Sequence, residues 1–219
     1  MKTVTKSGRE LSYVIEKKRI KHTYFRLKDN HVHITTHKFV KESQIIALLN
    51  QKFDVLYDKL NHKTLIPDDQ IRLWNHLYKL IVRQGKFRYE IVDDTVICYA
   101  DTNDINQIKK MIYNIETISM TESLKPKIKE TIARVGIDEL PYKFKYLKSK
   151  YGSYHKKHNE ITLNTFLSTL EPVFLEYVIY HEYAHAKVFN HSKAFYQVLD
   201  QMMVNHKNIQ KTLKKMEII

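Results

Sequence analysis

The stretch His181-Glu182-Tyr183-Ala184-His185 places two imidazoles and one carboxylate within little more than a helical turn. Residues four apart lie one above the other on the same helix face, so His181 and His185 can share one metal ion. Glu182 lies about 100° around the helix axis. From there its carboxylate can take a proton from metal-bound water without being a ligand itself. The spacing therefore predicts a site that holds one Zn²⁺ ion and activates water.

The residues before this motif predict the helix that carries it. The segment 172–180 begins with a proline, which suits a first helical turn, and has an acidic residue, Glu176, soon after. Apolar side chains at helical spacing form a stripe that carries both histidines inward: Phe174, Tyr177, Val178, Ala184 and Val188. The alternative interpretation of this stripe is a pair of hydrogen-bonded core histidines that bind no metal.

A third histidine follows in Asn190-His191-Ser192. In a continued helix His191 would point about 120° away from His185. The helix is therefore expected to end near Asn190, a residue that tolerates the left-handed conformation. Ser192 would then cap a second helix over residues 193–206. His191 lies in the joint between the two helices, from which it can fold back toward the ion.

Three histidine ligands leave a fourth position open, which is typical of catalytic rather than structural zinc. His191 is therefore predicted as the third ligand. The alternatives are that His191 is an exposed turn histidine and that a downstream carboxylate, Asp200 or Glu217, takes its place. Three imidazoles plus water suit zinc, although a site of this kind also accepts other ions.

Composition excludes several classes of protein. A chain of 219 residues with 43% hydrophobic residues can bury a sizeable core. The single cysteine, Cys98, excludes a disulfide framework and a thiolate zinc site, and it suits a reducing cytoplasm. Four glycines without a phosphate-binding loop argue against a nucleotide enzyme. Residues 1–10 lack an apolar signal core, and charges interrupt the apolar segment 173–188, so we expect a cytoplasmic protein without a membrane span.

Periodicity divides the chain into a β-rich part and a helical part. Helical spacing predicts helices over 42–60 and 104–135, the second kinked or restarted at Pro126 and stopped by Gly136. Alternating residues predict strands over 11–16, 22–28, 32–36, 86–92, 95–100, 143–147 and 160–164. We expect an α+β protein with a β-hairpin-rich region 1–102 before a helical catalytic region 103–219, unless the two form one compact unit. No internal repeat is evident.

Four segments together resemble a known family. They are the loop 148–154 (KSKYGSY), the segment 159–164 (NEITLN), the HExxH helix and the turn 190–195 (NHSKAF). This combination resembles the YgjP-like metallopeptidases, which are zincin-type proteins with more distant relatives among SprT-like and WLM-type proteases. The resemblance covers most of the chain, since a basic β-hairpin over 11–36 and a helix from about 42 to 60 also fit. It implies a zincin-like catalytic half, with the HExxH helix against a small antiparallel sheet and His191 as the third ligand.

One departure from the family is plain. A Trp-Gly-Ser-Cys segment precedes the strand in that family, whereas this chain has Tyr151 and Tyr154 where Trp and Cys usually stand. The metal ligands are unaffected by this difference. A role assigned to the family's cysteine does not carry over.

The resemblance also implies a reaction, the hydrolysis of a peptide bond. Zinc would polarise the scissile carbonyl, and Glu182 would take a proton from water and later give one to the leaving amine. Zincins lay an extended substrate along an edge strand above the active-site helix, here the strand 160–164 with Ile161. Tyr154, Tyr151 and Tyr196 are candidate donors to the developing oxyanion, although tyrosines commonly pack half-buried in a core.

Charge is the second strong signal. The net charge of +13 and pI of about 9.5 predict attraction to polyanions or acidic proteins. A second group of lysines, interleaved with aromatic residues, runs over residues 142–157. The candidate contacts to nucleic-acid phosphates in this group are Lys148, Lys150, Lys156 and Lys157. The plainer interpretation is a strand with its lysines in water.

These observations favour a cytoplasmic zinc metallopeptidase with one ion per chain and a protein or peptide substrate. Two alternatives stay open: a basic nucleic-acid-associated protein whose metal site is structural or vestigial, and a protease that acts on DNA-bound proteins. The sequence does not indicate the oligomeric state.

Overall fold

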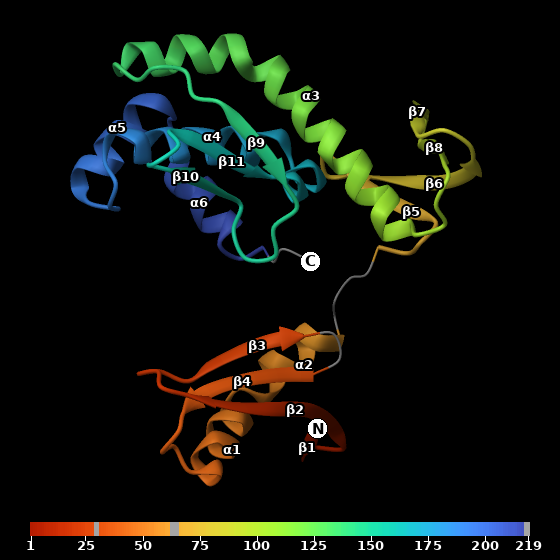
Figure 1. The fold of residues 1–219 in the computed structure, drawn as a ribbon, viewed down its shortest axis with the longest axis vertical. Helices are drawn as coiled ribbons and strands as arrows, with labels where there is room; N and C mark the ends of the chain where they lie inside the picture. The colour runs from red at the N-terminus through yellow and green to blue at the C-terminus, as the bar shows by residue number, and fades with distance from the viewer. Residues whose placement is uncertain (29–30, 62–65, 217–219) are drawn as a thin grey trace. The chain divides into compact units, whose positions relative to one another are not determined.

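The computed structural model describes residues 1–28, 31–61 and 66–216, and the chain divides into two compact units (Figure 1). Unit 1 is Met1–Leu65 and unit 2 is Ile66–Ile219. The expected boundary at residues 102/103 falls inside unit 2, between a sheet and a long helix. Both units combine helices with strands, so the expected α+β class is confirmed.

Unit 1 is a four-stranded sheet with helices packed on one face. Its strand order is β1-β2-β4-β3, with a parallel central pair, β2 and β4, between two antiparallel hairpins. Its elements are β1 (Lys2–Lys6), β2 (Arg9–Lys18), β3 (Tyr24–Lys28), β4 (His31–His37), α1 (Glu42–Gln51) and α2 (Phe53–Asn61). Alternate strand residues face the helices and form the core: Leu11, Tyr13, Val32, Ile34, Ile45, Leu49, Phe53 and Leu56.

Details of unit 1 differ from the expectation. The expected hairpin over 11–36 is confirmed only for its second half, where β3 and β4 pair antiparallel, whereas β2 pairs in parallel with β4. Strand β1 is not evident from the sequence because its polar residues bind the helices, as when Lys6 Nζ lies 2.7 Å from Asp54 Oδ2. The expected helix over 42–60 is interrupted at Lys52, which separates α1 from α2.

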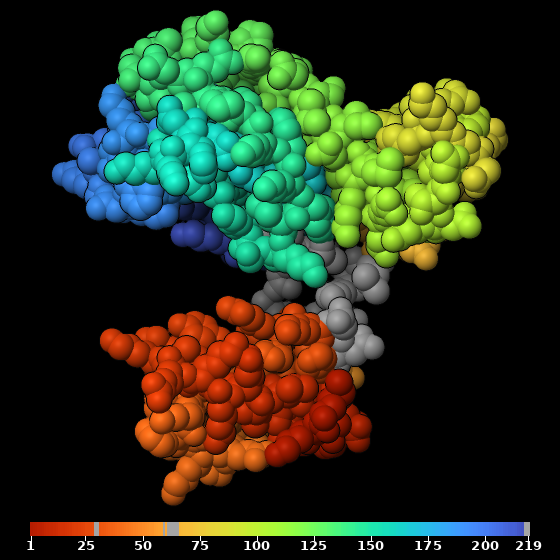
Figure 2. Space-filling view, viewed as in Figure 1, coloured from red at the N-terminus to blue at the C-terminus, as the bar shows by residue number. Residues whose placement is uncertain are grey.

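Unit 2 begins with a second four-stranded sheet, which forms most of the yellow lobe in Figure 2. Its strands are β5 (Gln70–Leu73), β6 (His76–Gln84), β7 (Arg88–Val92) and β8 (Thr95–Ala100), in the order β5-β6-β8-β7. Helix α3 (Ile105–Arg134) starts where the Asp104 side chain accepts hydrogen bonds from the backbone N–H groups of Asn106 and Gln107, at 3.0 and 3.1 Å. Its first turns bury Ile108 and Ile112 against the sheet.

The first hairpins of the two sheets have the same register. The end pair Lys6↔Arg9 of β1–β2 corresponds to Leu73↔His76 of β5–β6, an offset of 67 residues (6 to 73). Both hairpins turn through two residues in the left-handed region: Ser7 and Gly8, with φ of 52° and 75°, and Trp74 and Asn75, with φ of 50° and 67°.

The rest of each sheet follows the same plan. In the second hairpins Tyr24↔Thr35 corresponds to Arg88↔Tyr99, an offset of 64 residues (24 to 88). The parallel central pairs Tyr13↔Val32 and Leu80↔Val96 also correspond. The two sheets are therefore a structural repeat, and the expectation of no internal repeat is wrong. The offset changes by three residues between the first and second hairpins. The connection from β2 to β3 in unit 1 is therefore three residues longer than the connection from β6 to β7 in unit 2.

The remainder of unit 2 forms a core around the HExxH helix. Helix α3 continues through Pro126 and buries Ile128 and Ile132 in this core, so one helix joins the β5–β8 sheet to the catalytic part. Gly136, with φ of 67°, follows its end as expected. The other elements are β9 (Tyr142–Lys145), β10 (Gly152–His155), β11 (Glu160–Asn164), the 3-10 helix η1 (Thr165–Thr169), α4 (Pro172–Lys187), α5 (Lys193–Met202) and α6 (His206–Leu213).

The sheet beside α4 corrects two expectations. Its order is β10-β11-β9, with β10 antiparallel and β9 parallel to β11, so it is mixed rather than antiparallel. Strand β11 is central and not an edge, and Ile161 is fully buried in it. The edge strand next to α4 is β10, because β10 and α4 are in contact.

Within the described residues, no helix combines the length and apolar character needed to cross a bilayer.

Candidate metal centre

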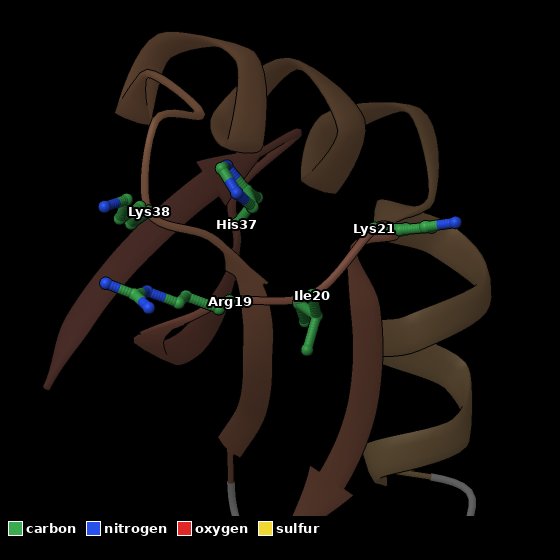
Figure 3. Close-up of a pocket in the computed structure, with 5 residues that line it drawn as sticks. All are labelled: Arg19, Ile20, Lys21, His37 and Lys38. Atoms are coloured by element: carbon green, nitrogen blue, oxygen red, sulfur yellow. The ribbon is translucent and has the colours of Figure 1, made fainter.

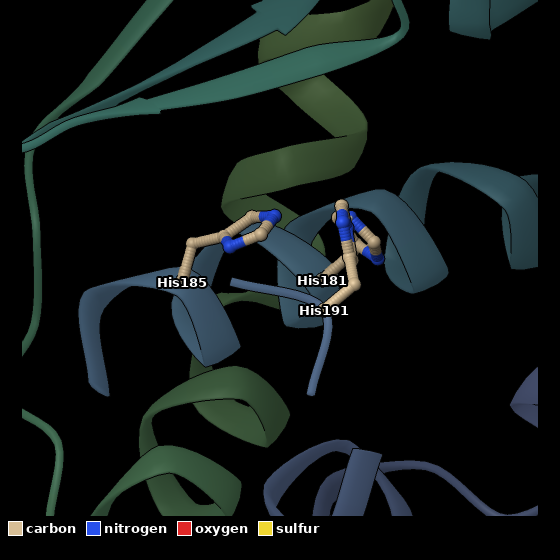
Figure 4. Close-up of side chains that lie close together, drawn as sticks. All are labelled: His181, His185 and His191. Carbon is tan, nitrogen blue, oxygen red and sulfur yellow. The ribbon is translucent and has the colours of Figure 1, made fainter. Parts of the chain in front are cut away.

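The site is built on α4. Pro172 occupies the first helical position, and the apolar stripe buries Phe174, Tyr177 and Val178, as predicted. Figure 4 shows His181 and His185 on successive turns, with their rings converging. The ring centroids are 4.9 Å apart.

His191 reaches the site from the segment after α4. The helix ends at Lys187, and Val188 is extended rather than helical. Asn190 is not among the described residues with positive φ, so the expected left-handed helix end at Asn190 is wrong. Ser192 lies at the N-cap of α5 as expected but makes no side-chain capping bond, and α5 ends at Met202 rather than near residue 206.

The three histidines fit a zinc ion. One ring nitrogen from each histidine lies within 4.8 Å of one from each of the other two, and His191 Nε2 is 3.1 Å from His181 Nε2. Tetrahedral zinc with bonds of about 2.0–2.1 Å places its nitrogen ligands roughly 3.4 Å apart. No other group of His, Cys, Asp or Glu with this geometry occurs in residues 1–28, 31–61 and 66–216. Asp200 instead binds His206, at 2.8 Å, and Glu217 lies outside the described residues.

The environment favours the neutral form of His181 and His185, the form in which a histidine binds a metal. Burial, reinforced by the neighbouring histidines, lowers the pKa of His181 to about 3. Burial also lowers the pKa of His185, opposed by its hydrogen bonds to the backbone of Val188 and Phe189.

Tyr177 orients His181. Its hydroxyl lies 3.2 Å from His181 Nδ1, so Nδ1–H can donate to the hydroxyl oxygen while Nε2 faces His191. Ligand histidines in metalloproteins usually donate their second N–H in this way, which fixes the tautomer and the ring plane.

Phe195 of α5 supports all three rings. It is fully buried, and its centroid lies 5.0 Å from that of His181, 4.6 Å from His185 and 4.8 Å from His191. Because α5 begins directly after His191, packing of Phe195 against α4 brings the third histidine to the other two.

Glu182 lies on the side of α4 that faces β10. It is 5% exposed, and its Oε2 accepts a hydrogen bond from the backbone N–H of Tyr154 at 2.6 Å. Burial raises the pKa of Glu182 to about 7, against the opposing effects of the Tyr154 N–H and the charge of Lys150. A carboxylate with a pKa near neutrality is suited to accept and return a proton.

Gly152 permits the close approach of β10 to α4. A Cβ atom at this position would lie 2.6 Å from Val178 Cγ1 and 3.0 Å from Glu182 Oε1. No side chain fits there, because real contacts of a Cβ atom are longer. The glycine therefore sets the distance at which Tyr154 N–H can reach Glu182.

The Gly152→Ala variant is expected to lose about 1–3 kcal/mol of unfolding free energy, as overpacked cores do. Chemical denaturation measures this loss. Ser153→Ala, the next residue of β10, serves as the control and should stay within roughly 0.5 kcal/mol of wild type. Equal stability of the two variants would contradict a tight β10–α4 contact.

The candidate tyrosines have structural partners. Tyr154 Oη donates to Asn159 Oδ1 at 2.9 Å, and it is the backbone of Tyr154, not its ring, that reaches Glu182. Tyr151 Oη donates to the Met216 carbonyl at 3.0 Å and so ties β10 to the segment after α6. Tyr196 stacks on His206 and lies 6.4 Å, centroid to centroid, from His191.

The lysines proposed to contact nucleic acid do not alternate with exposed aromatic rings on which bases could stack. Lys148, Lys150, Lys156 and Lys157 are all exposed, in the loops on either side of β10. The aromatics that alternate with lysines nearby pack inward instead, into the cores of unit 2: Tyr142, Phe144, Tyr146, Tyr151 and Tyr154. The structure thus separates these lysines from aromatic partners, except that Lys156 Nζ lies 5.9 Å from the ring centroid of Phe189.

Sequence reasoning missed three residues of the site: Tyr177, Phe195 and Gly152. Tyr177 precedes His181 by four residues, a spacing that signals contact on a helix, yet it was assigned only to the apolar stripe. Phe195 was recognised only as part of the 190–195 motif. Gly152 carries no local signal, because its role depends on the distant residue Val178.

The Tyr177→Phe variant is expected to weaken zinc binding about 10- to 100-fold, because His181 loses its hydrogen-bond partner. Competition with a chromogenic chelator measures the affinity. Tyr180→Phe is the matched control: Tyr180 is also buried on α4, but its hydroxyl bonds Thr131 Oγ1 at 3.3 Å. Equal affinity losses in both variants would argue against a specific role for Tyr177.

Comparison with known proteins points to one family. The model of the YgjP-like family, metallopeptidase domain, matches residues 21–216. Among solved structures, the chain is similar to the metallopeptidase zymogen abylysin of Pyrococcus abyssi, with 22% identity and a TM-score of 0.39 over 43% of this chain and 92% of that one. It is also similar to the zymogen jannalysin of Methanocaldococcus jannaschii, with 22% identity and a TM-score of 0.37 over 42% and 94%. Comparison with curated proteins finds no match.

The family match covers most of the chain, and the chain belongs to the YgjP-like family through its metallopeptidase domain. The expectation of a metallohydrolase of the peptidase class is confirmed at this level.

Proposed function

We propose that the protein is a zinc-dependent peptidase in which His181, His185 and His191 hold the ion and Glu182 is the general base. The observation that carries the proposal is the convergence of three histidine nitrogens within 4.8 Å beside a buried carboxylate. The donor set supports zinc, because it consists of neutral imidazoles without a thiolate or a second carboxylate.

When bound, Zn²⁺ supplies Lewis-acid polarisation of a carbonyl and lowers the pKa of a water molecule. The protein's own groups handle the proton. Glu182 accepts it as the water attacks the scissile carbonyl, and then donates it to the amine nitrogen as the C–N bond breaks. The Tyr154 N–H holds the carboxylate in place during both steps.

The substrate is proposed to lie along β10 rather than β11. The Tyr151 carbonyl accepts a hydrogen bond from Asn164 N–H at 2.8 Å. Hydrogen-bonded and non-hydrogen-bonded pairs alternate along an antiparallel ladder, so the backbone N–H and C=O groups of Gly152 and Tyr154 point away from β11. The carbonyls of these two residues and the N–H of Gly152 are available to an added peptide strand. Phe189, 68% exposed and 6.5 Å from the His185 ring, is positioned to contact a substrate side chain.

The test uses the purified full-length chain, stripped of metal and reloaded with zinc. We expect about one zinc per chain by elemental analysis and marked loss in His191→Ala. Mass spectrometry of a denatured protein mixture should show new peptide termini only with the zinc-loaded wild type. Absence of zinc after reloading would refute the metal site. Full zinc occupancy without any cleavage would favour a structural or vestigial site instead.

A further inference from the structure

Within the described residues of each unit, helices pack on only one face of each of the two repeated sheets. In unit 1 the helices pack on the face that carries Val32 and Ile34, and in unit 2 helix α3 packs on the face that carries Val96 and Cys98. The opposite faces are termed open face 1 and open face 2. Their residues alternate with the core residues along each strand.

Cations outnumber acids on both open faces. Open face 1 carries Lys18, Arg26 and Lys28 against Glu10 and Glu16, and three histidines lie on the same face: His31, His33 and His37. Glu16 is already paired with Lys18, at 2.9 Å. Open face 2 carries Arg72, Lys79, Arg83 and Arg88 against Glu90.

Most of the net positive charge of the chain lies in the segment that forms unit 1. Residues 1–65 contain fourteen Lys and Arg against six Asp and Glu, so this segment contributes +8 of the net +13. The charged residues of the two faces occupy different positions along the equivalent strands, yet the net charge of both faces is positive. A polyanion is therefore the partner whose charge complements both faces.

A pocket extends open face 1. The connection between β2 and β3 contains the three residues that the second sheet lacks, and it lines a pocket of about 460 Å³ with the residues after β4: Arg19, Ile20, Lys21, His37 and Lys38 (Figure 3). In Figure 3, Arg19 and Lys38 extend on the same side of the pocket, and Lys21 points away from them. No acidic residue lines this pocket.

Each open face also presents an aromatic ring. Tyr24 is 48% exposed beside Arg26 on β3. On open face 2 the Arg88 guanidinium lies 3.9 Å from the Tyr99 ring centroid, and Arg83 lies 6.0 Å from it. Unpaired bases stack on tyrosine rings and on guanidinium planes, whereas an acidic protein has no bases to stack on them.

We propose that open faces 1 and 2 each bind single-stranded nucleic acid, with lysine and arginine on phosphates and tyrosine on unpaired bases. This binding is independent of the metal centre. Duplex DNA is a poorer fit, because its bases are stacked within the helix and cannot reach Tyr24 or Tyr99.

The test measures fluorescence anisotropy of a labelled single-stranded oligonucleotide of about 20 nucleotides between about 50 and 300 mM salt. Full-length wild type is compared with R26Q/K28Q on open face 1 and R83Q/R88Q on open face 2. Each pair should raise the Kd of its own face roughly 10-fold and leave the other face binding, so the variant that combines both pairs should weaken binding at both faces. At each mutated face the slope of log K against log salt should fall by about 1.4, or 0.7 for each lost phosphate contact. The matched control is K207Q/K211Q, which removes the same charge from two exposed positions on α6.

A second variant separates nucleic acid from other polyanions. In the R83Q/R88Q background, where open face 1 carries the binding, Tyr24→Leu should weaken oligonucleotide binding at least about 5-fold through lost stacking and leave heparin binding unchanged. The proposal is overturned if the oligonucleotide does not bind at low salt, or if the α6 control loses as much affinity as the face variants. It is also overturned if Tyr24→Leu has no effect, or if polyglutamate competes as well as unlabelled oligonucleotide, which would indicate an acidic protein partner.

Discussion

The Glu182→Gln variant is expected to lose about 10²- to 10⁴-fold in kcat while it keeps its zinc, because an amide cannot accept the proton of the attacking water. Glutamine has nearly the same shape, and its carbonyl oxygen can still accept the Tyr154 N–H bond that the carboxylate accepts at 2.6 Å. Peptide cleavage and zinc content are measured on the same preparation. A variant with wild-type zinc and wild-type activity would rule out Glu182 as the base.

The same substitution has a stability effect in the metal-free protein. Burial raises the pKa of Glu182 to about 7, above its ordinary value of 4.5. The folded state therefore favours the protonated acid, and this contribution is fully present below about pH 4.5 and lost as pH rises through about 7. Glu182→Gln should remove that part of the pH dependence, worth roughly 3 kcal/mol between the two limits. Urea unfolding at several pH values shows whether the slope changes.

Phe195→Ala is expected to cost about 3–5 kcal/mol of unfolding free energy, since it removes a fully buried aromatic ring. It should also weaken zinc binding strongly, because the ring contacts all three histidines. Denaturation of the metal-free protein gives the first quantity and chelator competition the second.

Leu199→Ala is the control that separates these two effects. Leu199 is also fully buried on α5 and should cost about 2–5 kcal/mol, yet it forms none of the ring contacts with the histidines. Zinc affinity should then fall much further in Phe195→Ala than in Leu199→Ala. Equal affinities at comparable stability would show that Phe195 contributes only to folding.

The features that the sequence predicted best depend on local spacing. Helix α4 and the pairing of His181 with His185 follow from residues four apart, and strands β7 and β8 follow from the alternation over residues 86–92 and 95–100. His191 was also placed correctly near the other two, although the reason given was wrong. The chain leaves the helix through an extended Val188 and bends over residues 189–192, without a left-handed Asn190.

The features that the sequence did not predict depend on contacts between distant residues. Strand β11 looks like an edge in the sequence, but β9 pairs with it in parallel from the far side, and no local pattern specifies that crossover. The repeat is hidden for a related reason: equivalent core positions keep only their apolar character, as in Phe25 and Tyr89 or Ile34 and Cys98. On the open faces the charged residues occupy different strand positions, so the two sheets share even less similarity there.

The burial of Cys98 has a practical consequence. The thiol is fully buried in the sheet beneath α3, and burial raises its pKa. A thiol reagent can therefore react only when the β5–β8 sheet opens, and the chain has no other cysteine to contribute background. The labelling rate then reports the free energy of opening between this sheet and α3. Because α3 also packs in the catalytic core, comparing that rate with and without zinc reveals whether metal binding stabilises a region that lies outside the site.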